Sequence, residues 1–276
     1  MASRLDVSAV PLQGGYIAKQ CPVVIQNQIL VPEARTEPSP EIRHRMDAGI
    51  LFEAELFDRV RVEGPGDWVI IPSGPPQLAQ ELTVEALTRG ALVIEQAFLP
   101  PDETGRRTGR PDLLVSHGGG YVPVDVKHHR TLDIAEGTVL VSDPPSPSPT
   151  DAFSLEGHSL RTNSADALQL AHYRRMLEAS GHASSSTLAG VLGKEAVIVW
   201  YDLDKPMWST PAKSDGKKRK LRTSGERYDF EFGFRLDIAA TALTHLRSGD
   251  IALLVEPMAC GECGGCGFHD HCFTTL

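Results

Sequence analysis

The sequence predicts an α/β fold in which helices alternate with short strands. Two observations lead to this prediction. Apolar residues recur at helical spacing over residues 41–60 and 164–180. Between these helices lie short apolar runs bounded by glycine and proline, at residues 91–99, 112–115 and 121–126, which are typical of strands. The resulting order of helix, three strands, helix and strand indicates a mixed α/β domain.

The remaining elements follow from the same patterns. One helix fits Gln77–Thr88, between the first predicted helix and the first strand, and another fits Phe234–Leu246. Asn163 or Ser164 is a suitable N-cap for the long central helix. Ala196–Leu203 has the continuous apolar run of a buried strand, which completes the predicted core.

Length and composition bound the class of protein. The 276 residues are 41% hydrophobic and 23% charged, a soluble mixture with enough apolar material for a sizeable core. No apolar run reaches the roughly 18 residues that span a bilayer. The segment Met1–Val10 lacks the basic-then-apolar pattern of a secretory signal. We therefore expect a cytoplasmic location and no membrane partner.

Charge is unevenly distributed along the chain. The net charge of the whole sequence is −9, whereas the segment Lys205–Arg227 carries +6 and is predicted to be loop-like. A net acidic protein is not covered by a nucleic-acid-binding surface, but one basic strip can hold a polyanion when acidic residues elsewhere bind metal. Four residues of the strip are expected to contact phosphates, the alternative being a solvated loop: Lys217, Lys218, Arg219 and Lys220.

Two acidic residues and a lysine mark a candidate catalytic hairpin. The motif Gly109-Arg110-Pro111-Asp112 is followed, after twelve residues, by Asp125-Val126-Lys127. Asp125 and Lys127 leave the same face of a predicted strand, and Asp112 starts the neighbouring strand, with a turn at Ser116–Gly120. Close carboxylates raise each other's pKa and attract Mg²⁺ or Mn²⁺, while a lysine can orient water and stabilise charge at phosphorus. A surface Asp–Lys pair is the alternative.

Two predicted helices supply further candidates. Gln169 and Tyr173 are four positions apart and share one helix face, where they suit contact with a substrate phosphate or with the lysine. An ordinary amphipathic helix is the alternative for this pair. Glu53, on the first helix, can supply a third carboxylate, and Glu55 and Asp58 are expected on solvated faces.

The cysteines indicate a second site. Four of the five lie within the last 17 residues, and Cys21 stands far from them in the sequence. In a reducing compartment, such clustering indicates a metal or iron–sulfur site rather than disulfides. Cys260, Cys263, Cys266 and Cys272 form a local set that suits zinc, whereas Cys21 in place of Cys260 gives a cluster that joins both chain ends. The residues alone leave zinc and iron–sulfur open.

Taken together, these motifs resemble the RecB-like branch of the PD-(D/E)XK nuclease superfamily. The resemblance implies a restriction-endonuclease-like core, with a mixed sheet flanked by helices, in one domain over 1–276. Its catalytic core would span 40–204, and segments 10–35 and 255–276 would together form an iron–sulfur domain. The matching elements are Cys21-Pro22, Arg45–Glu53, Val93–Ala97, Gly109–Asp112, Asp125–Lys127, Gln169–Tyr173 and the terminal cysteines.

The resemblance also implies roles for individual residues. Asp112, Asp125 and Glu53 would bind Mg²⁺ or Mn²⁺, and Lys127 would serve the hydrolytic water. Several relatives have a histidine where Glu53 stands, so this position departs from their pattern while keeping an oxygen ligand.

The same family supplies an expectation for the helix motif and for the cysteines. Gln169 and Tyr173 match the Gln-x-x-x-Tyr element of nucleases related to RecB, AddB and the CRISPR-adaptation exonucleases. Many relatives carry a [4Fe-4S] cluster, and Cys260 would then be the spare thiol. The cluster ligands would be Cys21, Cys263, Cys266 and Cys272.

The implied function is that of a Mg²⁺- or Mn²⁺-dependent deoxyribonuclease, in particular an exonuclease, acting in DNA repair, recombination or defence. Its expected partners are DNA, as single strands or duplex ends, and a helicase or other DNA-processing protein. The alternative is a catalytically inactive nucleic-acid-binding or adaptor protein with a zinc-type cysteine tail. The intact set of Asp112, Asp125 and Lys127 favours the enzyme.

Overall fold

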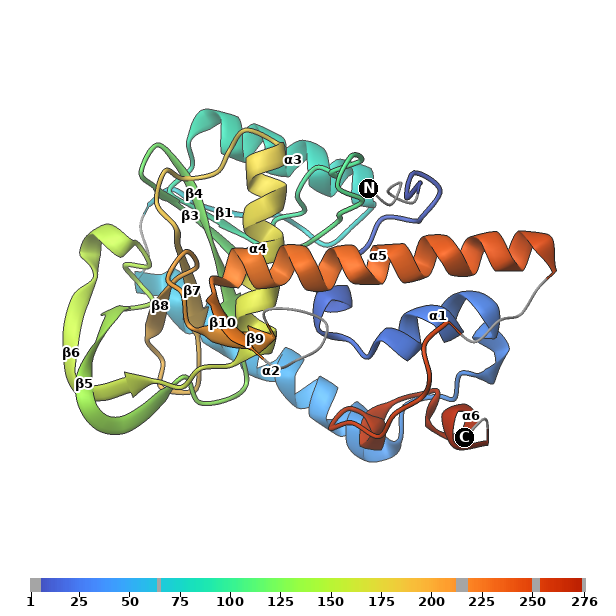
Figure 1. Ribbon diagram of the computed structural model, residues 1–276. Coiled ribbons are helices and arrows are strands. Elements are labelled where there is room, and N and C mark those ends of the chain that lie inside the picture. Colours follow the sequence, from blue (N-terminus) through green and yellow to red (C-terminus); the bar gives the residue numbers. More distant parts are fainter. Residues whose placement is uncertain (1–5, 64–65, 212–217, 250–253, 275–276) are drawn as a thin grey trace.

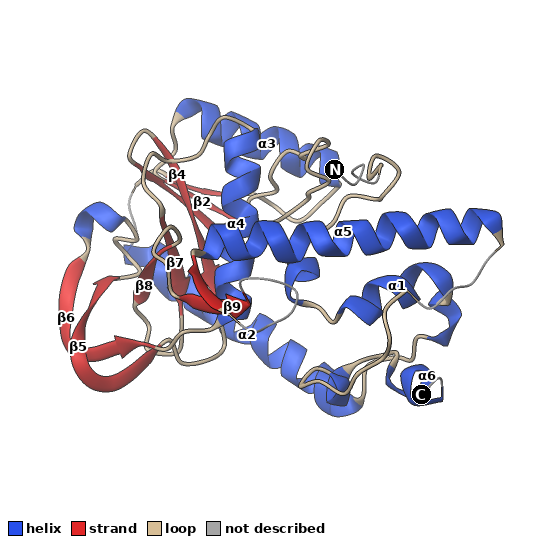
Figure 2. Ribbon diagram, in the orientation of Figure 1, coloured by secondary structure: helices blue, strands red, loops and turns tan. Residues whose placement is uncertain are grey.

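The computed structural model describes residues 6–63, 66–211, 218–249 and 254–274 (Figure 1). Within these ranges, eight strands form a mixed central sheet flanked by helices, and two strands form a separate hairpin (Figure 2). The predicted α/β class is therefore confirmed.

The strands are β1 Trp68–Ile70, β2 Val93–Glu95, β3 Leu113–His117, β4 Gly120–Val126, β5 Leu132–Ser142, β6 Phe153–Leu160, β7 Leu188–Leu192, β8 Ile198–Asp202, β9 Trp208–Pro211 and β10 Arg219–Arg222. The helices are α1 Pro22–Leu30, α2 Pro40–Glu63, α3 Pro76–Arg89, α4 Ser164–Ala179, α5 Ser224–Ser248 and α6 His269–Thr274, with 3₁₀ turns η1 Gly15–Lys19, η2 Pro32–Ala34, η3 Pro149–Asp151 and η4 Cys263–Gly265.

The predicted hairpin lies in the middle of the central sheet. The strand order is β1-β2-β3-β4-β7-β8-β5-β6, with β1 parallel to β2, β4 parallel to β7, and the other neighbours antiparallel. β3 and β4 turn at Gly118 and Gly119, whose φ angles of +55° and +76° are those that a tight hairpin turn requires. The register pairs Leu113 with Val124, so residues just before β3 lie across from the end of β4.

The observed strands differ from the predicted ones in two places. The apolar run 91–99 forms only the short strand β2, because Gln96 adopts a φ of +55° and ends the strand. The sequence does not predict the long pair β5 and β6. Most of β5 is exposed, so its pairing with β6 is mainly through the backbone and leaves no alternation of apolar and polar residues.

The prediction of a loop over the basic strip is wrong at both ends of the strip. β9 and β10 form an antiparallel hairpin there, with Arg219 across from Pro211. The Arg219 guanidinium stabilises the hairpin because its Nε donates a hydrogen bond to the Ser209 hydroxyl (2.8 Å). Lys217 lies outside the described residues. Lys218, Arg219 and Lys220 lie at the start of β10 and in the residue before it.

Helices cover both faces of the sheet. On one face, α2 packs Leu56, Phe57 and Val60 against residues of β2, β3, β4, β7 and β8. On the other face lie α3 and α4, and α5 runs across α4 and beside α1 (Figure 1). No helix in the described ranges is both long and apolar enough to cross a membrane.

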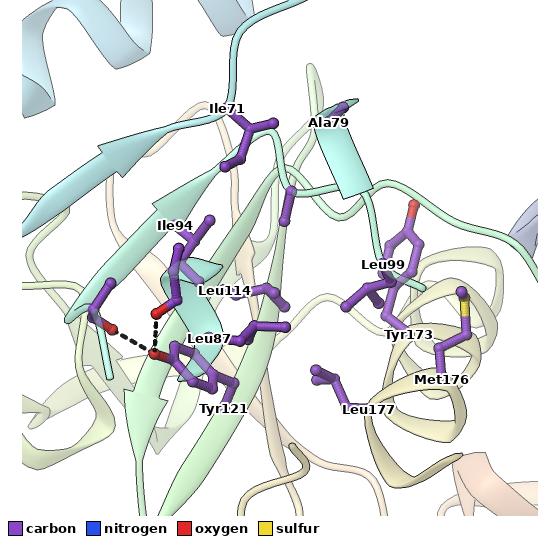
Figure 3. Packing of buried hydrophobic residues seen from close by; sticks show 13 residues of the cluster. Ile71, Ala79, Leu87, Ile94, Leu99, Leu114, Tyr121, Tyr173, Met176 and Leu177 are labelled. Atoms are coloured by element: carbon purple, nitrogen blue, oxygen red, sulfur yellow. Dashed lines mark hydrogen bonds between the residues drawn. The ribbon is translucent and has the colours of Figure 1, made fainter. Parts of the chain in front are cut away.

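The cluster beneath α3 and α4 fixes the position of α4 on the sheet. Tyr173 and Met176 of α4 pack beside Leu114 of β3 in a fully buried group (Figure 3). Tyr121 of β4 joins this cluster, and its hydroxyl donates a hydrogen bond to the Ala91 carbonyl oxygen (2.8 Å). Since α4 carries the Gln-x-x-x-Tyr motif, this packing holds the motif against the end of β4.

A buried histidine on α4 makes the stability of the fold sensitive to acid. His172 is fully buried, with Nδ1 2.8 Å from the Tyr228 hydroxyl and Nε2 3.0 Å from the Thr108 carbonyl oxygen. Burial lowers the pKa of His172 to about 4, and the Arg107 charge contributes to this shift. An unfolded histidine binds a proton near pH 6.5, so below that pH the unfolded chain takes up a proton that the native chain excludes.

We therefore expect the free energy of unfolding to fall by about 3 kcal/mol through His172 as the pH is lowered from 7 to 4. Urea unfolding at several pH values measures the effect. The variant His172→Gln removes the titrating group at that position and should lose this part of the pH dependence. An identical pH dependence in the variant and the wild type would show that His172 does not carry it.

Candidate functional site

Two carboxylates meet at the end of the central hairpin. The register of β3 and β4 places Asp112 across from Asp125, as the sequence spacing predicts. The backbone N–H of Val126 donates a hydrogen bond to Asp112 Oδ2 (2.6 Å), which holds this side chain against β4. The Asp125 side chain is 1% exposed, so its charge lies inside the protein rather than on a strand edge.

Glu53 reaches the same place from α2. The Gln96 side-chain amide donates a hydrogen bond to Glu53 Oε1, and the Gln96 backbone N–H donates to the Asp112 carbonyl oxygen (2.8 Å). Gln96 holds the left-handed conformation described above, which a glutamine adopts only where the surroundings enforce it. The motif Val93–Ala97 includes Gln96 but indicates no role for it, because its contacts with the Glu53 carboxylate and the Asp112 backbone depend on that backbone conformation.

Lys127 and the α4 motif complete the group. Lys127 Nζ forms an ion pair with Asp125 and lies 3.3 Å from Gln169 Oε1. Gln169 Nε2 lies 3.4 Å from Asp125 Oδ1 and donates a hydrogen bond to the Tyr173 hydroxyl (3.0 Å), which in turn donates to the Arg110 carbonyl oxygen (3.1 Å). The two motifs that the sequence separates by more than forty positions are thus joined by direct contacts.

Burial and neighbouring charges shift the pKa values of the ionisable side chains at this site. Burial raises the pKa of Asp112 well above its usual range, and repulsion from Asp125 and Glu53 adds to the shift. Burial and the Asp125 charge likewise raise the pKa of Glu53. Burial opposes the charge on Lys127, but Asp125 and Asp112 outweigh it and raise its pKa. A divalent cation would relieve the repulsion among the three carboxylates.

The donor chemistry of this group fits Mg²⁺ or Mn²⁺. The three acidic side chains offer oxygen ligands, and Asp125 Oδ2 is buried with the Lys127 ammonium as its ion-pair partner. As they stand, however, no three histidine, cysteine, aspartate or glutamate side chains among the described residues are placed to enclose one ion.

Other acidic residues of α2 lie away from the group. Glu55 is exposed, and Asp58 forms a solvent-exposed ion pair with Arg61 (3.2 Å). The Arg61 guanidinium also binds the buried carboxylate of Glu95 with two hydrogen bonds of 2.8 Å. Glu95 is therefore paired, whereas Glu53 is held by the Gln96 amide alone among the contacts described here.

All five cysteines line one pocket, together with Val23 and Val24 of α1. Cys260 is exposed and its Sγ lies 3.6 Å from Cys263 Sγ, whereas the other four are half-buried. Burial raises the pKa of the Cys272 thiol, with further contributions from Cys266, Cys21 and Cys263. The thiols that contribute to this shift are those of the predicted cluster set, and sulfur ligands in this pocket suit either iron–sulfur or zinc.

Hydrogen bonds connect the two chain segments that form this pocket. The Cys21 backbone N–H donates to the Glu262 carboxylate (2.9 Å), across 241 positions of sequence. Thr36 N–H donates to the Gly267 carbonyl oxygen (2.8 Å), and Gln26 Oε1 accepts from the backbone of Val255 (2.9 Å). Figure 1 shows the red C-terminal segment beside the start of α2 and near α1.

Comparison with protein-family models, with curated proteins and with solved structures finds no match to this chain. The proposed function therefore rests on the geometry of this chain's own residues.

Two further residues of the site come from the N-terminal segment. Lys19 of η1 donates a hydrogen bond from Nζ to Gln169 Oε1 (2.9 Å), the oxygen that Lys127 also approaches. Burial and the Lys127 charge lower the pKa of Lys19 to about 8. Tyr16 lies beside Lys19, whose Nζ is 4.0 Å from the centre of the Tyr16 ring. No local pattern marks these residues, because a contact across 150 positions brings them to α4.

Proposed function

We propose that this protein is a Mg²⁺- or Mn²⁺-dependent DNA nuclease with a PD-(D/E)XK-type core, and an exonuclease in particular. The observation that supports the proposal best is the meeting of Glu53, Asp112, Asp125 and Lys127, from α2 and from either side of the β3–β4 hairpin, at one end of the sheet. A strand-edge Asp–Lys pair would be exposed, whereas Asp125 is buried against α4.

The chain's own residues suggest how hydrolysis would proceed. Asp112, Asp125 and Glu53 would hold the cation, which supplies Lewis-acid activation of water and neutralises charge on the phosphate. Lys127 would orient the attacking water and stabilise the negative charge that develops at phosphorus. Gln169 keeps Lys127 in place, since its side chain contacts both Lys127 and Asp125. Tyr173 fixes the orientation of the Gln169 amide.

We also propose a [4Fe-4S] cluster ligated by Cys21, Cys263, Cys266 and Cys272. All five cysteines line the same pocket, and the observation that supports this set over the local one is that Cys260 is the most exposed of the five. The role of the cluster would be structural, because it would join the segments that flank the nuclease core.

One assay tests the nuclease proposal. End-labelled single-stranded and duplex DNA are incubated with the purified protein and EDTA, Mg²⁺ or Mn²⁺, with Asp125→Ala as the control. We expect shortening of labelled DNA only with a divalent cation and only with the unaltered protein. Cleavage that persists in the Asp125→Ala preparation would assign it to a contaminant, and binding without cleavage would favour an adaptor.

The basic hairpin gives a separate prediction for DNA binding. Lys218 is exposed, and Lys220 forms an exposed ion pair with Glu226 (3.5 Å). The double variant Lys218→Gln, Lys220→Gln leaves Arg219 to stabilise the hairpin. If both lysines contact phosphates, the slope of log K against log salt for single-stranded DNA should decrease by about 1.4, because each contact releases counterions. Titrations at four salt concentrations measure the slope, and an unchanged slope would identify a solvated hairpin.

A further inference from the structure

The N-terminal segment places an aromatic ring and a cation at the edge of the candidate active site. Lys19 and Lys127 both direct an ammonium group to the same oxygen of Gln169, at 2.9 and 3.3 Å. Gly15 also lies against this helix: a Cβ there would lie 3.4 Å from side-chain atoms of Gln169 and His172, at van der Waals contact. The segment is therefore packed directly on the helix that carries the Gln-x-x-x-Tyr motif.

Tyr16 is exposed although its neighbours are buried. Its ring is 57% exposed, whereas Ile17 and Ala18 are almost fully buried. One ring face is covered by the Lys19 ammonium, and Tyr16 lies within electrostatic reach of Lys127 and Tyr173. An exposed aromatic ring next to a cation and a group of carboxylates is a surface suited to a nucleotide, whose base stacks and whose phosphate binds the cation.

Hydrogen bonds with α5 and with the C-terminal segment fix the backbone at the end of this N-terminal segment. The Arg235 guanidinium of α5 is buried and donates two hydrogen bonds to the Gln20 carbonyl oxygen, at 2.8 and 2.6 Å. The next residue, Cys21, is bound through its backbone to Glu262. The backbone that follows Lys19 is thus anchored at Gln20 and Cys21, which reduces the entropy lost when a ligand binds.

We propose that Tyr16 and Lys19 form a nucleotide-binding subsite for single-stranded nucleic acid, in which Lys19 binds a phosphate next to the scissile one and Tyr16 stacks on an unpaired base. The inference rests on the proposed nuclease function, since it takes the neighbouring carboxylates as the reaction centre. It adds a selection for unpaired bases, because a base within a duplex does not expose its face to a side chain.

Equilibrium binding in EDTA tests the subsite without cleavage. The complete, cluster-containing protein is titrated into single-stranded oligonucleotides that carry 2-aminopurine at successive positions, and into a blunt duplex. We expect the wild type to quench 2-aminopurine at one position, and Tyr16→Ala to lose the quenching and bind the single strand about tenfold more weakly. Tyr16→Phe should retain both properties. Phe153→Ala, which removes an exposed ring from β6, should behave as the wild type.

Variants that remove or keep the positive charge of Lys19 test whether it binds a phosphate. Lys19→Gln should weaken single-strand binding and reduce the salt slope by about 0.7, whereas Lys19→Arg should keep the slope. No quenching at any position in the wild type, or an equal loss of duplex binding in Tyr16→Ala, would overturn the subsite. These outcomes are distinct from failure of the proposed function. If the protein never cuts DNA but still quenches 2-aminopurine through Tyr16, the subsite is supported and the nuclease proposal is wrong.

Discussion

Replacing Asp125 by asparagine or Lys127 by alanine is expected to lower the rate of DNA cleavage by at least about 10³-fold. Asp125 is central to the group, since it contacts Lys127 and Gln169 and raises the pKa of both Asp112 and Glu53, together with burial. Removing its charge would weaken cation binding and leave Lys127 without its ion-pair partner. Removing the Lys127 ammonium would delete the positive charge expected at the phosphate.

Matched variants on α2 separate a catalytic effect from a general one. Glu53→Gln should lower activity strongly because its carboxylate lies in the group, whereas Glu55→Gln should leave activity unchanged because that side chain is exposed. Initial rates at saturating Mn²⁺ measure the effect, and melting temperatures check that the fold is retained. Normal cleavage by Lys127→Ala, or equal losses for Glu53→Gln and Glu55→Gln, would contradict the assignment.

The sequence predicts the part of the site that depends on local geometry. Asp112 and Asp125 can be placed together from spacing alone, because a tight hairpin at Gly118 and Gly119 fixes their register. The pair Gln169 and Tyr173 shares a helix face for the same kind of reason. What spacing does not determine is which surface that helix face contacts; this depends on the packing of α4 against the sheet.

The residues missed by sequence reasoning are those placed by long-range contacts or by unusual backbone. Gln96 reaches Glu53 only because its φ is positive, and such a conformation leaves no mark in a pattern of apolar residues. Lys19 reaches Gln169 because η1 packs on α4. The segment Tyr16–Lys19 itself has no sequence pattern that distinguishes it from other segments of mixed polarity. The hairpin of β9 and β10 was missed because its residues are largely exposed.

Cys21→Ala is expected to produce a colourless protein with a markedly lower melting temperature, whereas Cys260→Ala is expected to keep the colour and stability of the wild type. Cys21 is half-buried in the cysteine pocket, and its backbone N–H donates a hydrogen bond to the Glu262 carboxylate. Cys260 is exposed, and its Sγ lies 3.6 Å from Cys263 Sγ. A cluster ligated by Cys21 closes a loop of more than two hundred residues.

Cross-linking a loop of this size stabilises a protein by about 5 kcal/mol in the chain-entropy model, which for a chain of this length corresponds to a shift of about 10 °C or more. Iron and acid-labile sulfide content, visible absorption and thermal unfolding measure the outcome for each variant. Because the lost cross-link lies outside the carboxylate group, DNA cleavage by Cys21→Ala should decline with the folded fraction rather than independently of it. The reverse pattern, with Cys260 essential and Cys21 dispensable, would instead indicate a local four-cysteine site, most simply a zinc site.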